Sequence, residues 1–425
     1  MSTADPDELT ATPPDPPGGD PSPLPRTRPG GGSETPPPTR RRAAGRPRRR
    51  WLRTAGRVLL LALAVVLVPV AWSYGHALTR PSSESVGIRT TEWVRDHGGR
   101  ALVAWAETSW YNHHQPKKGG VPALSALPRV VTAPPTTVPA TAAVPTPVRL
   151  LASPALPGEG RWQPSGRNGA DGLPLLYTTF MRPDPVHTSL VTGLAWMDPV
   201  RVRLALYSGY DEPGGRGWTL TAPLPYALRP GLVAAFNSGF KLADSRGGYM
   251  AEGRVAPGHP LVAGKASLIV HADGTATVGV WGRDAVTGPD IVAVRQNLQL
   301  LIDGGQEAPN LDVNSLAVWG WTVKNATLVW RSGIGVDAHG HLIYAAGMGL
   351  SVRSLANVLL AAGCVRAMEL DINSQWVSFL SYATDPAAPG GTAGSKLIPQ
   401  MSASVNRYFA PSDRDFFAVF ARDNV

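Results

Sequence analysis

The chain has 425 residues, of which 43% are hydrophobic and 17% are charged, with 40 basic side chains against 31 acidic ones. Nine arginines between residues 40 and 57 account for the whole basic excess, because the two counts are otherwise equal at 31. The net charge of +9 is therefore local, and it gives no reason to expect a nucleic-acid-binding domain. The single cysteine, Cys364, excludes an intramolecular disulfide.

The N-terminal part predicts a tail followed by a membrane helix. Residues 1–50 are rich in Pro, Gly, Ser, Thr and Arg, a composition that predicts a disordered tail. Residues 56–78 are largely apolar and predict one transmembrane helix of about the length that a span needs. The arginines predict a cytoplasmic N-terminus and an extracellular C-terminal part, as in a single-pass signal anchor of the cell membrane. A cleaved signal peptide is the alternative, against which the long arginine-rich flank argues.

Two further segments precede the main domain. Residues 85–112 predict a juxtamembrane helical segment, interrupted near Gly98, whose apolar face would lie along the bilayer or pack on the domain. Residues 119–157 are rich in Pro, Ala and Thr and predict an extended linker. Residues 158–425 are then long enough to form one domain around one core.

Strand patterns dominate this domain. Short apolar runs around turns that contain Gly predict two hairpins, over residues 266–281 and 327–346. Residues 352–362 predict an amphipathic helix with Ser351 as its N-cap. Because other helix signals are few, we expect an α+β fold, a single sheet-rich domain with a mixed or antiparallel sheet.

The strand that follows this helix carries the most informative polar residues. Side chains alternate between the two faces of a strand, so Glu369, Asp371 and Asn373 are expected on the face opposite three apolar residues. Two carboxylates and an amide would then lie in line at the end of an apolar strand. Such a row is costly unless water, a partner or a ligand satisfies it.

Two other segments add an amide and a cation. Asn237 follows the apolar run 232–235 in a sequence typical of a tight turn, and Lys241 could face an anion there. An ordinary turn with an exposed lysine is the alternative. Arg295 and Asn297 would share one face of another predicted strand.

Arg331 lies within the apolar hairpin at residues 327–346. A guanidinium in such a place needs an acidic partner. The partner is either a phosphate of a ligand or a protein carboxylate, Asp371 or Glu369, in a structural ion pair.

Taken together, three of these segments resemble a known family. They are Asn237-Ser238-Gly239-Phe240, the stretch Arg331-Ser332-Gly333-Ile334-Gly335-Val336-Asp337, and the helix that leads into Leu370-Asp371. Their order is similar to that of the phosphodiester glycosidase domain family (N-acetylglucosamine-1-phosphodiester α-N-acetylglucosaminidase-like), in a membrane-anchored bacterial branch. The family strand usually ends in Leu-Asp-Gly-Gly-Gly-Ser, whereas this chain continues with Ile372-Asn373-Ser374.

The resemblance implies a membrane-anchored hydrolase outside the cytoplasm that cleaves a sugar 1-phosphodiester in envelope or extracellular glycoconjugates. It implies catalytic roles for Asp371, Arg331 and Asn237. It implies substrate-binding roles for Lys241, Asn373, Glu369, Arg295 and Asn297. We expect no metal site and no cofactor. The alternative is a non-catalytic envelope protein that binds a phosphodiester-containing polysaccharide in the same cleft, which the loss of the family glycines favours.

Overall fold

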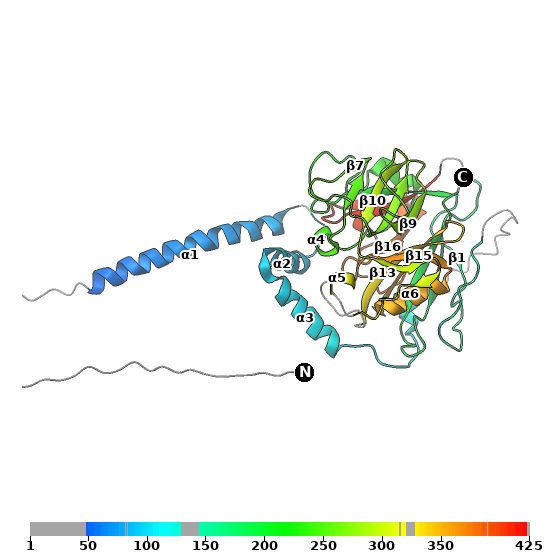
Figure 1. Ribbon diagram of the computed structural model, residues 1–425, viewed down its shortest axis with the longest axis horizontal. Coiled ribbons are helices and arrows are strands. Elements are labelled where there is room, and N and C mark those ends of the chain that lie inside the picture. The colour runs from blue at the N-terminus through cyan, green and yellow to red at the C-terminus, as the bar shows by residue number, and fades with distance from the viewer. Residues whose placement is uncertain are drawn as a thin grey trace, which may run out of the picture. The chain divides into compact units, whose positions relative to one another are not determined.

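The computed structural model describes residues 48–80, 82, 84–128, 144–313, 316–319, 328–388 and 390–422. The chain divides into two units, residues 1–66 and 67–425, and helix α1 (Arg48–Thr79) runs through the division (Figure 1). Among the described helices, α1 alone is long and apolar enough to cross a membrane, over Trp51–Thr79. The predicted disordered tail, residues 1–50, lies outside the described residues except where α1 begins.

The largest sheet of the second unit has eight strands, and its neighbouring strands pair antiparallel. In spatial order they are β1 (Gln163–Pro164), β2 (Tyr177–Met181), β3 (Thr192–Met197), β14 (Leu342–Leu350), β13 (Val329–Asp337), β15 (Cys364–Glu369), β11 (Leu300–Asp303) and β12 (Gln306–Glu307). The hairpin predicted at residues 327–346 is β13–β14, so this prediction is confirmed.

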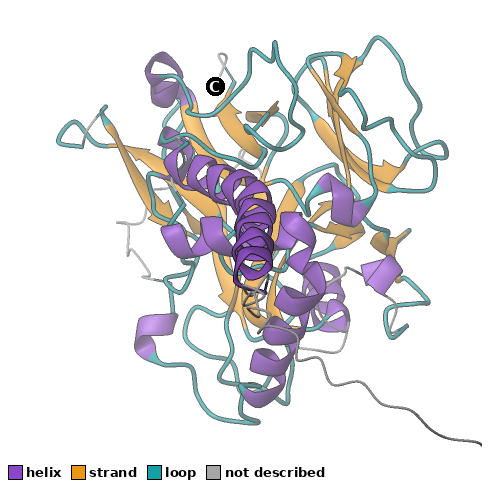
Figure 2. Cartoon of the chain, turned by 90° about the vertical axis from the view of Figure 1, so that its left-hand side faces the viewer, coloured by secondary structure: helices purple, strands orange, loops and turns teal. Residues whose placement is uncertain are grey.

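The described residues also form two five-stranded sheets, in which neighbouring strands pair antiparallel. Figure 2 shows the strands in orange. The second sheet orders β7 (Arg254–Val255), β6 (Tyr249–Ala251), β10 (Ile291–Gln296), β8 (Ala266–His271) and β9 (Ala276–Val280). The third orders β17 (Thr392–Lys396), β16 (Phe379–Thr384), β5 (Leu232–Asn237), β18 (Phe416–Ala421) and β4 (Val202–Tyr207). The predicted hairpin at residues 266–281 is β8–β9. The expectation of a sheet-rich antiparallel fold with few helices is thus confirmed.

The described helices of the second unit are short. They are α2 (Val86–Val94), α3 (Arg100–His113), α4 (Leu242–Ser245), α5 (Leu316–Trp319) and α6 (Val352–Ala361). Helix α6 begins at the predicted N-cap, Ser351. The Ser351 hydroxyl accepts a hydrogen bond from the Ser354 N–H, and the Ser354 hydroxyl accepts one from the Ser351 N–H, which together form a capping box. Its apolar side chains, among them Leu355 and Leu359, are buried against the eight-stranded sheet.

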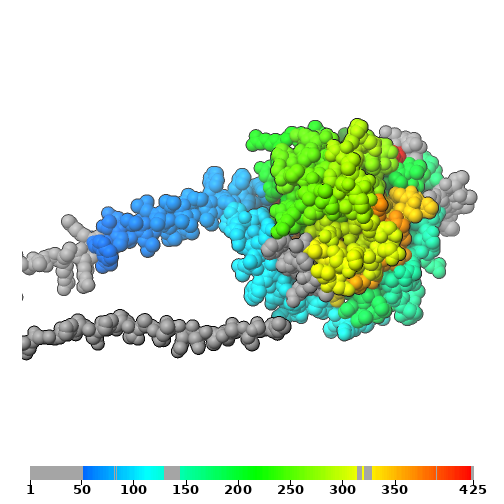
Figure 3. Space-filling model, in the orientation of Figure 1, coloured from blue at the N-terminus to red at the C-terminus, as the bar shows by residue number. Residues whose placement is uncertain are grey.

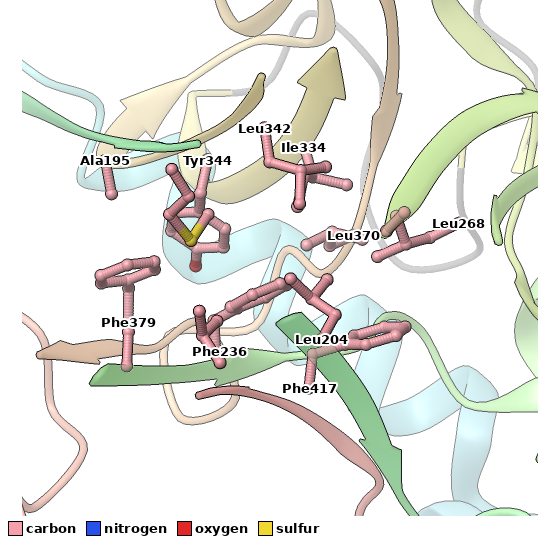
Figure 4. Close-up of a cluster of buried hydrophobic side chains, with 14 of the residues drawn as sticks. Ala195, Leu204, Phe236, Leu268, Ile334, Leu342, Tyr344, Leu370, Phe379 and Phe417 are labelled. Atoms are coloured by element: carbon pink, nitrogen blue, oxygen red, sulfur yellow. The ribbon is translucent and has the colours of Figure 1, made fainter. Parts of the chain in front are cut away.

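The main core lies where the three sheets meet. Figure 4 shows Phe236 of the third sheet near Tyr344 of the first, with ring centroids 5.4 Å apart, and Phe417 stacks on Phe236 at 5.5 Å. Leu268 of the second sheet joins the same cluster. Leu370, one residue past the end of β15, is fully buried here, so the core fixes the backbone next to Asp371.

Two glycines of the Arg331–Asp337 segment are required by packing. A Cβ at Gly335 would lie 2.6 Å from both the Arg366 carbonyl oxygen and the Cys364 sulfur. A Cβ at Gly333 would lie 3.1 Å from a methyl group of Leu359 on α6. Part of the family-like pattern therefore has a structural cause, the close approach of β15 and α6 to β13.

Helices α2 and α3 are joined by a kink, η1 (Arg95–Gly99), where the backbone of His97 and Gly98 is not helical. This is the place where the sequence predicts an interruption. The segment Val86–His113 contacts the domain through ion pairs near α4 (Figure 1). Of the predicted linker, residues 129–143 lie outside the described residues, while Val148 and Ala152 are buried in the domain.

Candidate functional site

The candidate site lies where strands of two different sheets end or begin. β5 ends at Asn237, and β15 ends at Glu369, two residues before Asp371. β18 begins just after Arg414. Antiparallel pairing of β18 with β5 places Phe416 opposite Asn237. The ends of these strands bring Arg414 and the backbone around Asn237 to the buried carboxylate of Asp371.

Asp371 is held by three donors. Its Oδ1 accepts the backbone N–H of Ile372 at 2.7 Å and of Asn373 at 2.9 Å, and Nη2 of Arg414 lies 3.2 Å from its Oδ2. Only 3% of the residue is exposed. Burial raises the pKa of Asp371, while Arg414 and the two backbone donors oppose the rise. The result is a carboxylate that takes up a proton more readily than an ordinary aspartate.

Arg414 is the cation that pairs with Asp371. Its guanidinium also donates to the carbonyl oxygen of Gly239 at 2.6 Å and lies over the ring of Trp376, 4.9 Å from the centroid. Its Nε is buried and takes no hydrogen-bond partner among the described residues. Burial lowers the pKa of Arg414, but Asp371 and Glu212 outweigh this and raise it, so the group stays charged. A spare donor on a fixed cation suits a phosphate oxygen.

A small cavity of about 40 Å³ adjoins Asp371. This volume is room for a few water molecules, at about 10–15 Å³ each, and is far below the roughly 300–1,000 Å³ of ligand pockets. Its walls are Arg95, Glu107, Tyr111, Phe240, Lys241, Asp244, Val329, Asp371, Ile372, Asn373, Trp376 and Arg414. Residues of η1 and α3 thus form one wall, and Figure 3 shows this cyan segment lying against the domain.

Lys241 lines the cavity, but its amine is already paired. Nζ lies within ion-pair distance of the Glu92 carboxylate and 3.0 Å from Oδ1 of Asp96. Lys241 also borders a larger neighbouring cavity of about 340 Å³, which shares Trp376 and Arg414 with the small one. In this arrangement Lys241 fastens the helical segment to the domain.

The two asparagines expected at the site are placed differently. Asn373 lines the cavity, and its side-chain oxygen accepts the N–H of Gln375 at 2.9 Å. The Asn237 amide instead donates to the Ser332 hydroxyl at 3.0 Å and accepts from the Tyr344 hydroxyl at 2.8 Å. Among the described cavities, Asn237 borders only a narrow space of about 10 Å³, which Asp371 also lines. Its amide therefore supports the site from within.

Glu369 and Arg331 form a structural pair away from the described cavities. Nη1 of Arg331 lies 2.6 Å from Oε1 of Glu369, and neither side chain is exposed. Nε of Arg331 donates to the Leu350 carbonyl oxygen at 2.8 Å. Burial raises the pKa of Glu369, and Arg331 lowers it in part. The partner that the sequence left open is thus Glu369. The expected polar row is divided, because β15 ends at Glu369 and strand alternation stops before Asp371.

Arg295 and Asn297 also lie behind the site. Nε of Arg295 lies 2.7 Å from Oδ2 of Asp415, and both side chains are fully buried. The Asn297 amide donates to the Leu370 carbonyl oxygen at 2.8 Å. The described structure therefore brings Asp371, Asn373 and Lys241 to the cavity. Arg295 and Asn297 instead stabilise the segments around Asp415 and Leu370, next to the residues that line it.

Sequence reasoning missed Arg414 and the wall formed by Arg95 and Glu107. Arg414 stands between two aspartates just before the aromatic strand β18, and that position beside a buried strand was its only local signal. Glu107 lies on α3, more than 250 residues before Asp371 in the sequence. No spacing pattern connects such distant segments.

Residues 230–371, about a third of the chain, match the family model described as phosphodiester glycosidase. No curated protein matches the chain. Among solved structures, the catalytic domain of zebrafish N-acetylglucosamine-1-phosphodiester α-N-acetylglucosaminidase, auto-inhibited by its pro-peptide, is 14% identical. The match covers 62% of this chain and 88% of that one, with a TM-score of 0.39.

Two other structures are similar at the same level. A protein from Synechocystis is 16% identical over 61% of this chain and 62% of its own, with a TM-score of 0.34. An exported protein from Burkholderia pseudomallei is 13% identical over 56% of this chain and 75% of its own, with a TM-score of 0.28. The family match spans Asn237, Lys241 and Asp371 and ends before Arg414. The resemblance to the phosphodiester glycosidase family is thereby confirmed for residues 230–371.

Proposed function

We propose that this protein hydrolyses the bond between the anomeric carbon of a sugar and a phosphodiester, in glycoconjugates of the cell envelope or outside the cell. The observation that carries the proposal is the pair of Asp371 and Arg414, a carboxylate and a cation held together at the cavity. The match of residues 230–371 to the phosphodiester glycosidases supports the same reaction.

The chemistry asks for two things that this pair supplies. A carboxylate must activate water or attack the anomeric carbon, and Asp371 is the cavity residue fixed for that task by two backbone donors. A cation must hold the departing phosphate, and Arg414 lines the cavity, pairs with Asp371 through Nη2 and has an Nε without a described partner. Asn373, which also lines the cavity, is proposed to orient the sugar.

We propose that the substrate reaches the small cavity beside Asp371 only after a movement of the chain. A cavity of about 40 Å³ does not hold a sugar phosphate, and the segment Val86–His113 forms one of its walls. We propose that this segment shifts outward to admit the substrate and closes again over it, as active-site covers do in other enzymes. Lys241 would then be freed from Glu92 and Asp96 and become available to the phosphate.

The membrane placement is part of the proposal. Helix α1 is long and apolar enough to cross a bilayer, and the nine arginines between residues 40 and 57, before its strictly apolar part, favour a cytoplasmic N-terminus. The domain would then work outside the cell. A membrane-impermeant protease added to intact cells should digest the domain, and protection of the domain would reject this orientation.

The test of function is turnover by the purified full chain of a panel of sugar 1-phosphodiesters, compared with the Asp371→Asn variant. Release of free sugar by the wild type, lost in the variant, supports hydrolysis. The second candidate is a binding protein, favoured by Ile372 and Asn373 where the family usually has glycine. Binding without turnover, unchanged in Asp371→Asn, would support that candidate and reject the enzyme.

A further inference from the structure

One wall of the cavity beside Asp371 comes from a segment outside the family match. Helix α3 turns Glu107 and Tyr111, one helical turn apart, toward the cavity. Its opposite side carries Leu102 and Trp105, which are exposed. Helix α3 therefore presents a carboxylate and a phenol to the candidate site.

Glu107 is held in place by a chain of ion pairs. Nη2 of Arg95 lies 2.8 Å from Oε1 of Glu107, and Nη1 of Arg95 lies 2.8 Å from Oε1 of Glu92. Glu92 in turn pairs with Lys241 of the domain. Arg95 is only 8% exposed, so its fork fixes two carboxylates in a mostly dry setting.

Glycoside hydrolysis generally uses two carboxyl groups, one to act on the anomeric carbon and one to protonate the leaving group. Glu369 does not fill the second role in this arrangement, because it is fully buried against Arg331 and lines none of the described cavities. Asp244 and Glu107 both line the cavity, and each pairs with an arginine, Arg100 at 2.7 Å and Arg95 at 2.8 Å. Of these two carboxylates Glu107 is the more accessible, with 28% of its side chain exposed against 13% for Asp244.

Resting on the proposed function, we propose that Glu107 is the general acid that protonates the departing phosphate ester at the site of Asp371. In this step water adds to the anomeric carbon and gives its proton to Asp371. The bond from that carbon to the bridging oxygen breaks, and the oxygen keeps the electron pair and takes the proton of Glu107. The products are the free sugar and a phosphate monoester, and solvent restores both side chains.

The environment of Glu107 suits an acid. Burial raises its pKa, Arg95 lowers it, and the nearby carboxylates Glu92 and Asp371 raise it again, so that the net direction is upward. The other charged groups around the cavity are Lys241, Asp244 and Arg414. Because Glu107 belongs to the segment that must shift for entry, closing this segment would deliver the proton only after the substrate is bound.

The test measures kcat against pH for the wild type, Glu107→Gln, Glu107→Asp and Asn112→Ala, all as the full chain in detergent micelles. Asn112 is an exposed residue on the same helix and serves as the matched control. We expect Glu107→Gln to lower kcat by about 100-fold, the low end for general acid catalysis, because a phosphate ester is a good leaving group. We also expect it to remove the fall of kcat at alkaline pH, which Glu107→Asp should retain.

Two results would overturn the role of Glu107 and leave the proposed function standing. One is wild-type turnover with an unchanged alkaline limb in Glu107→Gln. The other is faster turnover in Glu107→Gln, which would make α3 an obstruction only. Absence of turnover by the wild type on every sugar 1-phosphodiester overturns the proposed function itself, so the two failures are distinguishable.

Discussion

The buried ion pair of Arg331 and Glu369 offers the sharpest test of whether a residue expected at the site has a structural or a catalytic role. Nη1 of Arg331 lies 2.6 Å from Oε1 of Glu369, and both side chains are fully buried. Removing one partner of such a pair costs roughly 3–5 kcal/mol, because the other charge is left uncompensated. Glu369→Gln keeps the shape and one acceptor, so we expect a loss of about 3 kcal/mol. At roughly 2–4 °C per kcal/mol for a mid-sized domain, the melting temperature should fall by several degrees.

The assay is thermal unfolding of the full chain, followed by circular dichroism, with turnover measured below the transition. Replacing both partners, as Arg331→Met with Glu369→Leu, should recover most of the lost stability, since apolar pairs often substitute for buried ion pairs. The matched control is Asp312→Asn, which removes an exposed partner of Arg353 and should leave the melting temperature unchanged. If Glu369→Gln melts like the wild type but has no turnover, Glu369 acts chemically and the structural assignment is refuted.

Three further predictions concern the site and its frame. Arg414→Met should reduce turnover of a sugar 1-phosphodiester by at least 100-fold. Arg414→Lys should recover part of the rate, because lysine restores the charge but not the guanidinium contacts of the wild type. Equal rates in the three proteins would contradict this. The fall of kcat/KM at acid pH should have a midpoint above the usual pKa of aspartate, about 3.9. Burial raises the pKa of Asp371, and protonation removes the carboxylate that activates water. A midpoint at or below about 3.9 would contradict this. Gly335→Ala should lower the unfolding free energy by about 1–3 kcal/mol, since the new Cβ would meet the Arg366 carbonyl oxygen and the Cys364 sulfur at 2.6 Å; denaturant unfolding that matches the wild type would show that β13 tolerates the methyl group.

Local signals were enough for several elements of the fold. The hairpins β8–β9 and β13–β14 follow from apolar runs around glycine-containing turns, and α6 follows from its period and its Ser351 cap. The division into three sheets could not be predicted in this way. It depends on pairings such as β5 with β18, whose residues lie about 180 positions apart in the sequence. The sequence of neither strand indicates which strand it pairs with.

The site was predictable only in part for the same reason. Asp371 carried a strong local signal, a carboxylate directly after an apolar strand, and it does line the cavity. The alternation rule then failed for Glu369, because the strand ends there and the two carboxylates face different partners, Arg331 and Arg414. Arg414 reaches the site through the pairing of β18 with β5, a contact that no local pattern indicates.

The most direct test of the central claim is hydrolysis in water enriched in oxygen-18, followed by mass spectrometry of both products. A glycosidase breaks the bond between the anomeric carbon and oxygen, so we predict that the heavy oxygen appears in the free sugar and that the phosphate monoester stays unlabelled. Label in the phosphate product would mean that the phosphorus–oxygen bond breaks instead. That result would contradict the assignment of Asp371 to attack at the anomeric carbon.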